Sequence, residues 1–159
     1  MVKANNKKES VNRFRSRSEH ILDSKGRLNI PSRFRDVLQN HFNDKLMVTN
    51  WDNCLKAFPV KVWDQIETTL MVQGKKQPGF AAFMRYVISG VAECPLDKHG
   101  RILLPPTLRT DFDLKKEVML NGMLDHFEIW DKTAWDKERK MTRDKFSDFE
   151  QSLSTLGIL

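Results

Sequence analysis

The chain has 159 residues, 40% of them hydrophobic, which suffices for a core in one domain or in two closely associated halves. No apolar run approaches the roughly 18 residues of a membrane-spanning helix, and no apolar stretch follows the basic N-terminal residues, so we expect neither a membrane protein nor a secretory signal peptide. The net charge is +6, but residues 1–35 hold ten Lys or Arg against three Asp or Glu, so they carry +7 and the remainder −1.

This concentration of positive charge favours a polyanionic partner, of which nucleic acid is the common one in cytoplasm. A solvated basic tail is the alternative interpretation. Cys54 and Cys94 lie in apolar, strand-like contexts without a metal-ligand spacing. They predict a reduced cytoplasmic protein in which both cysteines are small buried hydrophobic residues.

The N-terminal segment divides into two parts. Residues 1–12 are polar and lack periodicity, which predicts a disordered extension. Arg13, Arg15 and Arg17 then alternate along a segment that we expect to be extended, so that their side chains project from one side. They form either an arm that reaches a DNA backbone or a charged strand edge that discourages aggregation.

A fourteen-residue phrase at residues 22–35 returns at residues 96–109, an offset of 74. Leu, Asp, Gly, Arg, Pro and Arg recur identically at matching positions. The spacing is too long for the usual solenoid repeats. We therefore expect a duplicated half-domain, with two copies that build one body.

Each copy contains an Asp-x-x-x-Arg pair around a glycine. Asp23 and Arg27 enclose three residues, the length of a hairpin closed by a type I turn followed by a left-handed glycine. Side-chain alternation then places Leu22 and Leu28 toward the core and the Asp–Arg pair away from it. The motif residues of the two turns are Asp23, Gly26 and Arg27, and Asp97, Gly100 and Arg101.

A helix is predicted after Pro31, with Ser32 as its N-cap and an apolar stripe of Phe34, Val37, Leu38 and Phe42. A shorter helix follows Pro105, and two further strands follow the helix in each copy. Each half therefore reads strand, strand, helix, strand, strand, helix. We divide the chain into an extension (1–12), a first half (13–72), a polar linker (73–79), a second half (80–140) and a helical C-terminal tail (141–159).

These motifs resemble the MraZ family. The match rests on Arg17-Ser18-Glu19-His20 leading into the first copy, on Ser89-Gly90-Val91-Ala92-Glu93-Cys94 leading into the second, and on residues 116–118 and 127–131. Similarity runs from about residue 13 to residue 135. A single copy would resemble only the broader AbrB/SpoVT swapped-hairpin group.

The resemblance implies an α+β fold in which duplicated half-domains form a double-split β-barrel with flanking helices. It also implies a ring-shaped homo-oligomer, cytoplasmic and nucleoid-associated, that regulates transcription. Such a protein chiefly represses its own division and cell wall gene cluster by binding short tandem promoter repeats in double-stranded DNA. No cofactor, membrane or small-molecule substrate is implied.

This chain departs from the family pattern in a longer N-terminal extension and at Pro95 and His99. Pro95 removes a backbone donor, so its strand should lie at a sheet edge or be bulged.

Arg27 is the first candidate for DNA contact, because an outward guanidinium can bond a phosphate or the O6/N7 edge of guanine bidentately. The alternative is that Arg27 only pairs with Asp23 across the hairpin. Asp23 would orient Arg27, and Lys25 at the turn apex would meet a phosphate. Arg101 and Lys98 repeat this geometry at lower local charge and are open candidates. Arg33 and Arg35 would serve a helix face or a subunit contact.

An enzyme is the rival class. The four histidines His20, His41, His99 and His126 are scattered, and no HExxH motif, Cys/His cluster or nucleophile elbow is present. We therefore predict no catalytic residues and no metal site. An antitoxin-like or architectural module that uses the same hairpins for protein contacts is the remaining alternative.

Overall fold

The computed structural model describes residues 13–40 and 43–158. The first half contributes β1 (Arg17–Ile21), β2 (Arg27–Asn29), α2 (Ser32–Asn40), β3 (Lys45–Asn50), β4 (Leu55–Pro59) and α3 (Val60–Gln73). The second contributes β5 (Ala92–Pro95), β6 (Arg101–Leu103), α5 (Pro106–Asp111), β7 (Glu117–Gly122), β8 (Phe127–Asp131), α6 (Lys132–Asp144) and α7 (Phe146–Thr155). The predicted order of strands and helices in each half is thus confirmed.

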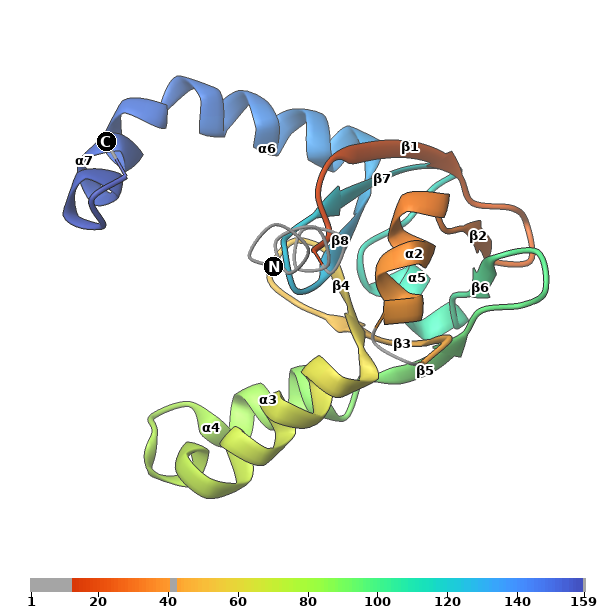
Figure 1. Ribbon diagram of the computed structural model, residues 1–159, viewed down its shortest axis with the longest axis horizontal. Coiled ribbons are helices and arrows are strands. Elements are labelled where there is room, and N and C mark those ends of the chain that lie inside the picture. The colour runs from red at the N-terminus through yellow and green to blue at the C-terminus, as the bar shows by residue number, and fades with distance from the viewer. Residues whose placement is uncertain (1–12, 41–42, 159) are drawn as a thin grey trace, which may run out of the picture.

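The strands form an antiparallel sheet of order β1-β7-β8-β4-β3-β5 and a separate pair, β2–β6 (Figure 1). The edge strand of each half pairs with the other half: β1 lies along β7, with Ser18 opposite Leu120, and β5 lies along β3, with Cys94 opposite Leu46. The two halves therefore exchange their first strands. Pro95 lies on the edge strand β5, as its missing N–H requires.

The two hairpin turns also interlock through their backbones. The Ile30 N–H donates to the Gly100 carbonyl at 3.0 Å, and the Leu104 N–H donates to the Gly26 carbonyl at 2.8 Å. Each glycine turn is therefore held by the chain that follows the opposite hairpin strand. The conformation of each turn therefore depends on hydrogen bonds from the other half.

The predicted pairing of the two strands of each hairpin with each other is wrong, because β1 pairs with β7 and β2 pairs with β6, and only the turn itself is closed by backbone hydrogen bonds. The predicted alternation of the side chains is confirmed. Leu22, Leu28 and Ile30 are buried, as are their counterparts Ile102 and Leu104. They join one core cluster that spans both halves, and its burial supplies the main driving force for assembly of the halves. The Asp–Arg pairs lie on the other face.

An aromatic trio lies within this core. Phe34 of α2, Phe127 of β8 and Phe14, which precedes β1, have ring centroids 4.9–5.4 Å apart. Phe14 is fully buried and exchanges backbone hydrogen bonds with Leu124. The segment before β1 is thereby anchored to the body.

The apolar stripe of α2 is confirmed for Phe34, Val37 and Leu38, which are buried, whereas Phe42 lies outside the described residues. The predicted N-cap is wrong. The Pro31 carbonyl accepts from the N–H groups of Phe34 and Arg35, so Pro31 holds the capping position and Ser32 is the first helical residue. The counterpart α5 is shorter, as predicted.

Between the halves the chain is helical. After α3 come a 3₁₀ turn η1 (Gly74–Lys76), α4 (Phe80–Phe83) and a π-helical turn η2 (Met84–Ile88). Together with α3 they form a projection beside the sheet, held by a second cluster that includes Phe58, Trp63 and Val87 (Figure 1). The predicted linker at residues 73–79 falls within this projection, and the predicted extension at residues 1–12 lies outside the described residues.

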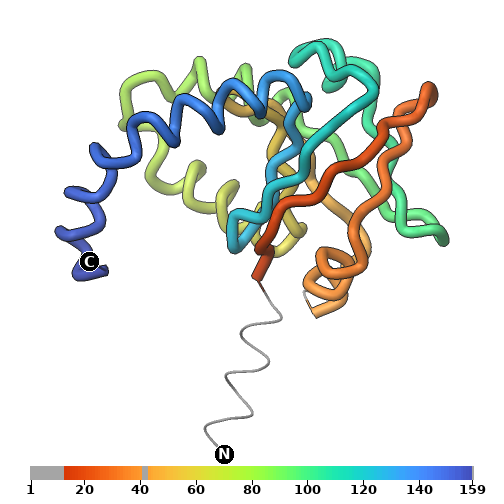
Figure 2. The backbone as a smooth tube through the Cα atoms, turned by 90° about the horizontal axis from the view of Figure 1, so that it is seen from above, coloured from red at the N-terminus to blue at the C-terminus, as the bar shows by residue number. Residues whose placement is uncertain are grey.

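The C-terminal helices α6 and α7 extend away from the body (Figures 1 and 2). Their exposed apolar side chains are Met141, Phe146, Phe149 and Leu156, followed by Ile158. No helix within the described residues is both long and apolar enough to cross a bilayer. Cys54 and Cys94 are unpaired and buried, as the sequence predicts.

The fold is therefore α+β with an antiparallel sheet and flanking helices. Over the described residues the strands form two separate sheets and close no barrel. The double-split barrel stays a prediction.

Candidate nucleic-acid interface

The first hairpin holds Arg27 through a network centred on Asp23. Asp23 Oδ1 accepts from the backbone N–H groups of Lys25 and Arg27 at 2.9 and 2.8 Å, and its Oδ2 accepts from Arg27 Nε at 2.5 Å. The Gly26 N–H donates to the Asp23 carbonyl at 3.0 Å, and the φ of Gly26 is +89°, as the predicted turn requires. The side chain of Arg27 is 39% exposed, so the pairing with Asp23 leaves the guanidinium accessible.

These contacts change the acidity of the carboxyl group. The backbone N–H of Arg27 has the largest effect and lowers the pKa of Asp23. Desolvation opposes it, and the guanidinium of Arg27 and the N–H of Lys25 lower the pKa further. Asp23 therefore stays ionised at lower pH than an ordinary aspartate does. Its charge is committed to the turn and to Arg27.

The second hairpin repeats the arrangement. Asp97 Oδ1 accepts from the N–H groups of His99 and Arg101 at 2.8 and 3.0 Å, and its Oδ2 accepts from Arg101 Nε at 3.0 Å. The backbone N–H of Arg101 lowers the pKa of Asp97. The φ of Gly100 is +75°, and the Arg101 side chain is 28% exposed. His99 is an exposed residue of this turn.

Both turns lie on one side of the molecule. In two perpendicular views they project to the right, opposite the helices α3, α6 and α7 (Figures 1 and 2). Lys25 and Lys98 are exposed in the turns themselves. The fold therefore brings both Asp-x-x-x-Arg motifs and the two turn lysines to a common cationic side.

Sequence reasoning missed one arginine at each turn. Arg109 and the Leu104 carbonyl lie close to Gly26. A Cβ added at Gly26 would lie 2.8 Å from the Leu104 carbonyl oxygen and 2.9 Å from Arg109 Nε. At Gly100 the added Cβ would lie 2.6 Å from Arg35 Nη1. Each turn is thus covered by an arginine from the other half. The identical recurrence of Arg35 as Arg109 in the repeat was the available signal.

The roles predicted for Arg35 change accordingly. It covers the opposite turn in this chain, whereas the sequence suggested a helix face or a subunit contact for both Arg33 and Arg35. Arg33 donates a hydrogen bond to the Ser16 hydroxyl. The Nε atoms of Arg35 and Arg109 are buried and have no hydrogen-bond partner among the described residues.

The three N-terminal arginines are all exposed, but they do not follow one regular strand. Phe14 turns into the core, so Arg13 and Arg15 flank it on the outside. Ser16 then has φ +82°, which interrupts the predicted alternation. Arg17 begins β1 and lies over the Trp135 ring of α6, 5.4 Å from its centroid. The expectation that all three side chains project from one side stays a prediction.

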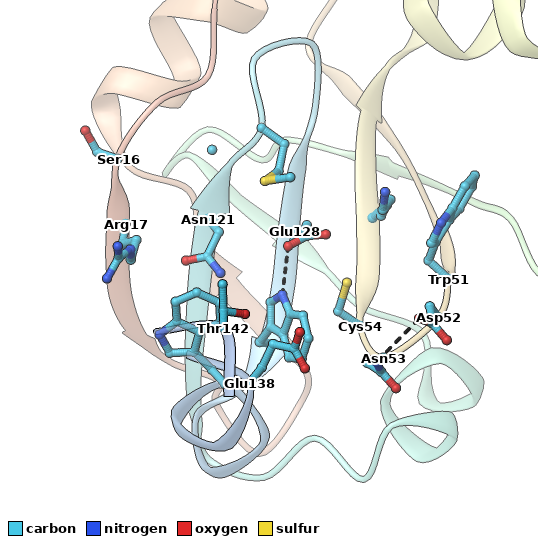
Figure 3. A pocket seen from close by; sticks show the side chains of 15 residues that line it. Ser16, Arg17, Trp51, Asp52, Asn53, Cys54, Asn121, Glu128, Glu138 and Thr142 are labelled. Atoms are coloured by element: carbon cyan, nitrogen blue, oxygen red, sulfur yellow. Dashed lines mark hydrogen bonds between the residues drawn. The ribbon is translucent and has the colours of Figure 1, made fainter. Parts of the chain in front are cut away.

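A hollow beside α6 is the main alternative location for chemistry (Figure 3). Arg17, Trp51, Cys54, Asn121, Glu128 and Glu138 are among its lining residues. Burial raises the pKa of the Cys54 thiol, and the nearby Glu128 raises it further. Glu128 itself accepts from the Trp130 indole at 2.9 Å. A protonated thiol is a poor nucleophile, and residues 13–40 and 43–158 hold no cluster of metal-ligating side chains.

Comparison with known proteins supplies a family. The family described as "MraZ protein, putative antitoxin-like" matches residues 14–80 and 87–155. The transcriptional regulator MraZ of Syntrophobacter fumaroxidans is 44% identical over 145 residues, which cover 91% of this chain and 97% of that protein. That of Desulforapulum autotrophicum is 38% identical over 147 residues (91% and 99%), and that of Pediococcus pentosaceus is 36% identical over 145 residues (91% and 99%).

Proposed function

The chain belongs to the MraZ family, and on that premise we propose that it is a DNA-binding transcriptional regulator whose two Asp-x-x-x-Arg hairpins face the DNA. The observation that carries the proposal is the exposure of the turn cations on one side of the body. Arg27 and Arg101 are oriented by aspartates yet remain accessible, and Lys25 and Lys98 are exposed beside them. The relatives are named transcriptional regulators, which supports the same class of activity.

A two-stranded ribbon fits the major groove of B-DNA, where arginine reads guanine and lysine meets phosphate. In this proposal Arg27 makes the base or phosphate contact of the first hairpin, and Arg101 makes its equivalent in the second. Lys25 and Lys98 contact phosphates. Arg13, Arg15 and Arg17 form a flanking basic surface, with Arg17 shared between DNA and Trp135.

We further propose that the protein acts as a ring-shaped homo-oligomer on tandem promoter repeats and represses its own division and cell wall gene cluster. One hairpin binds weakly and with steep salt dependence. Repetition around a ring makes successive contacts effectively intramolecular and raises affinity without new contacts. The exposed apolar residues of α6 and α7 supply a surface for self-association.

The same proposal places the protein at the nucleoid in the cytoplasm. In this proposal the interlocked halves form a double-split barrel, whose two parts are the β2–β6 pair and the six-stranded sheet. The exchange of β1 and β5 between the halves supports that interpretation.

The experiment is a footprint of the full chain on its own upstream region, with the mass of the protein in solution measured in parallel. We expect protection of tandem short boxes, loss of protection as salt rises, and a mass several times that of one chain. An upstream region that stays unprotected would contradict the proposed role as a transcriptional regulator.

An antitoxin-like or architectural module is the second candidate, and the description of the family as "putative antitoxin-like" favours it. Such a protein would use the hairpins for protein contacts. It would leave the upstream region unprotected at every salt concentration while still forming a complex with a protein partner.

A further inference from the structure

A basic groove lies beside the first turn and is built largely by the second half. Asp23 and Ser24 line one part of it, and Arg109, Lys115 and Lys116 line another. Lys115 and Lys116 come from the loop between α5 and β7, more than eighty residues away in the sequence. The groove therefore adds cations to the first hairpin that the repeat motif itself does not contain.

Backbone contacts fix this loop against the hairpin. The Leu22 N–H, at the start of the turn, donates to the Lys116 carbonyl at 2.8 Å. The Lys115 N–H donates to Asp131 Oδ1 at 3.2 Å. Because these hydrogen bonds fix the backbone of Lys115 and Lys116, their exposed side chains begin at fixed positions beside the first turn.

The charge of the groove is not cancelled by its neighbours. Asp23 already accepts three hydrogen bonds within its turn, one of them from the Arg27 guanidinium. Glu117, the residue that follows Lys116, forms no ion pair in the part of the chain that the structure describes. Among the described residues, no carboxylate lies within ion-pair distance of the Lys115 or Lys116 ammonium groups. Their charge is available to a ligand.

The second hairpin has a different neighbour at the equivalent position. The Leu96 N–H donates to the Asp44 carbonyl at 2.7 Å, which mirrors the bond between Leu22 and Lys116. Asp44 and Asn43 thus stand where the first hairpin has Lys116 and Lys115. The next cation, Lys45, lies 4.0 Å from Glu93. An anion would meet two lysines at one turn and an aspartate at the other.

We propose that the groove beside the first turn binds backbone phosphates of DNA through Lys115 and Lys116, so that the first hairpin carries a composite phosphate site built from both halves. The inference rests on the proposed DNA-binding function and adds to it that the two hairpins are unequal. A β-ribbon in a major groove about 12 Å wide is bordered by phosphates. Because Lys115 and Lys116 line the groove beside the first turn, they would meet that border when the turn enters the major groove.

Arg109 positions the site. Its guanidinium covers Gly26, and its carbonyl accepts from the Leu114 N–H at 2.9 Å, directly before the two lysines. It therefore links the turn of the first hairpin to the loop that supplies the ammonium groups.

The test measures the affinity of the full chain for a duplex of its upstream region, and for a scrambled duplex of equal length, over a series of salt concentrations. The variant is Lys115→Gln/Lys116→Gln. The matched control is Lys75→Gln/Lys76→Gln, which removes the same charge from exposed residues of η1 in the projection opposite the hairpins. Thermal melting of all three proteins verifies that each is folded.

We expect the groove variant to reduce the slope of log affinity against log salt by about 0.9–1.8 for each bound protomer, since each lost phosphate contact contributes about 0.9. The loss should be equal for both duplexes, because phosphate contacts carry no sequence information, and the control should keep the wild-type slope. A groove variant with the wild-type slope, in a protein whose affinity still depends on Arg27, would overturn this inference alone and would leave the groove to another anionic ligand or to none. Failure of the wild-type protein to bind either duplex would overturn the proposed function as well.

Discussion

The two hairpins share their internal chemistry and differ in what surrounds them. In both, the aspartate carboxylate accepts hydrogen bonds from two backbone N–H groups and from one guanidinium. The carbonyl of the left-handed glycine accepts a hydrogen bond from a backbone N–H of the other half. Around the first turn lie Lys115 and Lys116, whereas Asn43 and Asp44 lie around the second. After duplication, the contacts that interlock the halves are thus retained, while the surface charge beside each turn is free to diverge.

The largest expected effects concern the glycines. Gly26→Ala introduces a left-handed strain of roughly 1–2 kcal/mol, and its Cβ would also lie 2.8 Å from the Leu104 carbonyl, which adds about 1–3 kcal/mol of overpacking. In Gly100→Ala the three nearest atoms all belong to the flexible Arg35 side chain, so we expect mainly the strain. Urea unfolding of the two variants should rank Gly26→Ala as the less stable. Equal stability would show that the turns are packed alike.

Arg27→Ala and Arg101→Ala compare the hairpins at the level of binding. A lost bidentate contact costs about 1–3 kcal/mol, which corresponds to about 5–150-fold in affinity. We expect Arg27→Ala to lose more affinity than Arg101→Ala in a gel shift on the upstream region. The cations Lys115 and Lys116 lie beside the first turn, so we expect that hairpin to make the closer contact with DNA. The reverse ranking would place the main contact on the second hairpin.

Asp44→Lys gives the second turn a lysine at the position where the first turn has Lys116. If a phosphate lies within reach of that position, the salt slope should steepen by about 0.9 for each bound protomer. The control Asp64→Lys makes the same charge change at an exposed position of α3, away from the hairpins. A slope that rises equally in both variants would indicate only a general electrostatic effect.

The smallest effect is on acid stability. The pKa values of Asp23 and Asp97 are lowered in the folded state, so their stabilising contribution is complete above the ordinary value of 3.8 and is lost as the pH falls through the folded pKa. Asp23→Asn and Asp97→Asn should therefore melt with a weaker pH dependence than the wild type as the pH falls below about 4. Parallel melting curves across that range would mean that neither carboxylate contributes to acid sensitivity.

Each turn, and the alternation of side chains around it, could be predicted from the sequence because the information is local. The Asp23 and Arg27 spacing specifies the turn, and alternation from Leu22 to Ile30 specifies the buried face. The C-terminal segment was predicted to be helical from its spacing, and α6 and α7 confirm it.

The remaining features depend on contacts between distant segments. The position of Arg109 over Gly26 follows from the exchange of strands between halves, which no local pattern encodes. The groove residue Lys116 is placed by a backbone bond to Leu22. The positive φ of Ser16 escaped prediction because serine rarely adopts that conformation. In each case tertiary contacts select a conformation that propensity alone would not.

The most direct test of the contact itself is site-specific crosslinking from the turns. Cys54 and Cys94 are buried, and burial raises the pKa of Cys94 to about 11, so a thiol-reactive photocrosslinker should modify Lys25→Cys, Lys98→Cys or Lys75→Cys selectively in the folded protein. On the upstream duplex we expect strong crosslinking from position 25, less from position 98 and none from position 75. Crosslinking from position 75 alone, with none from either turn, would contradict the assignment of the hairpins to DNA.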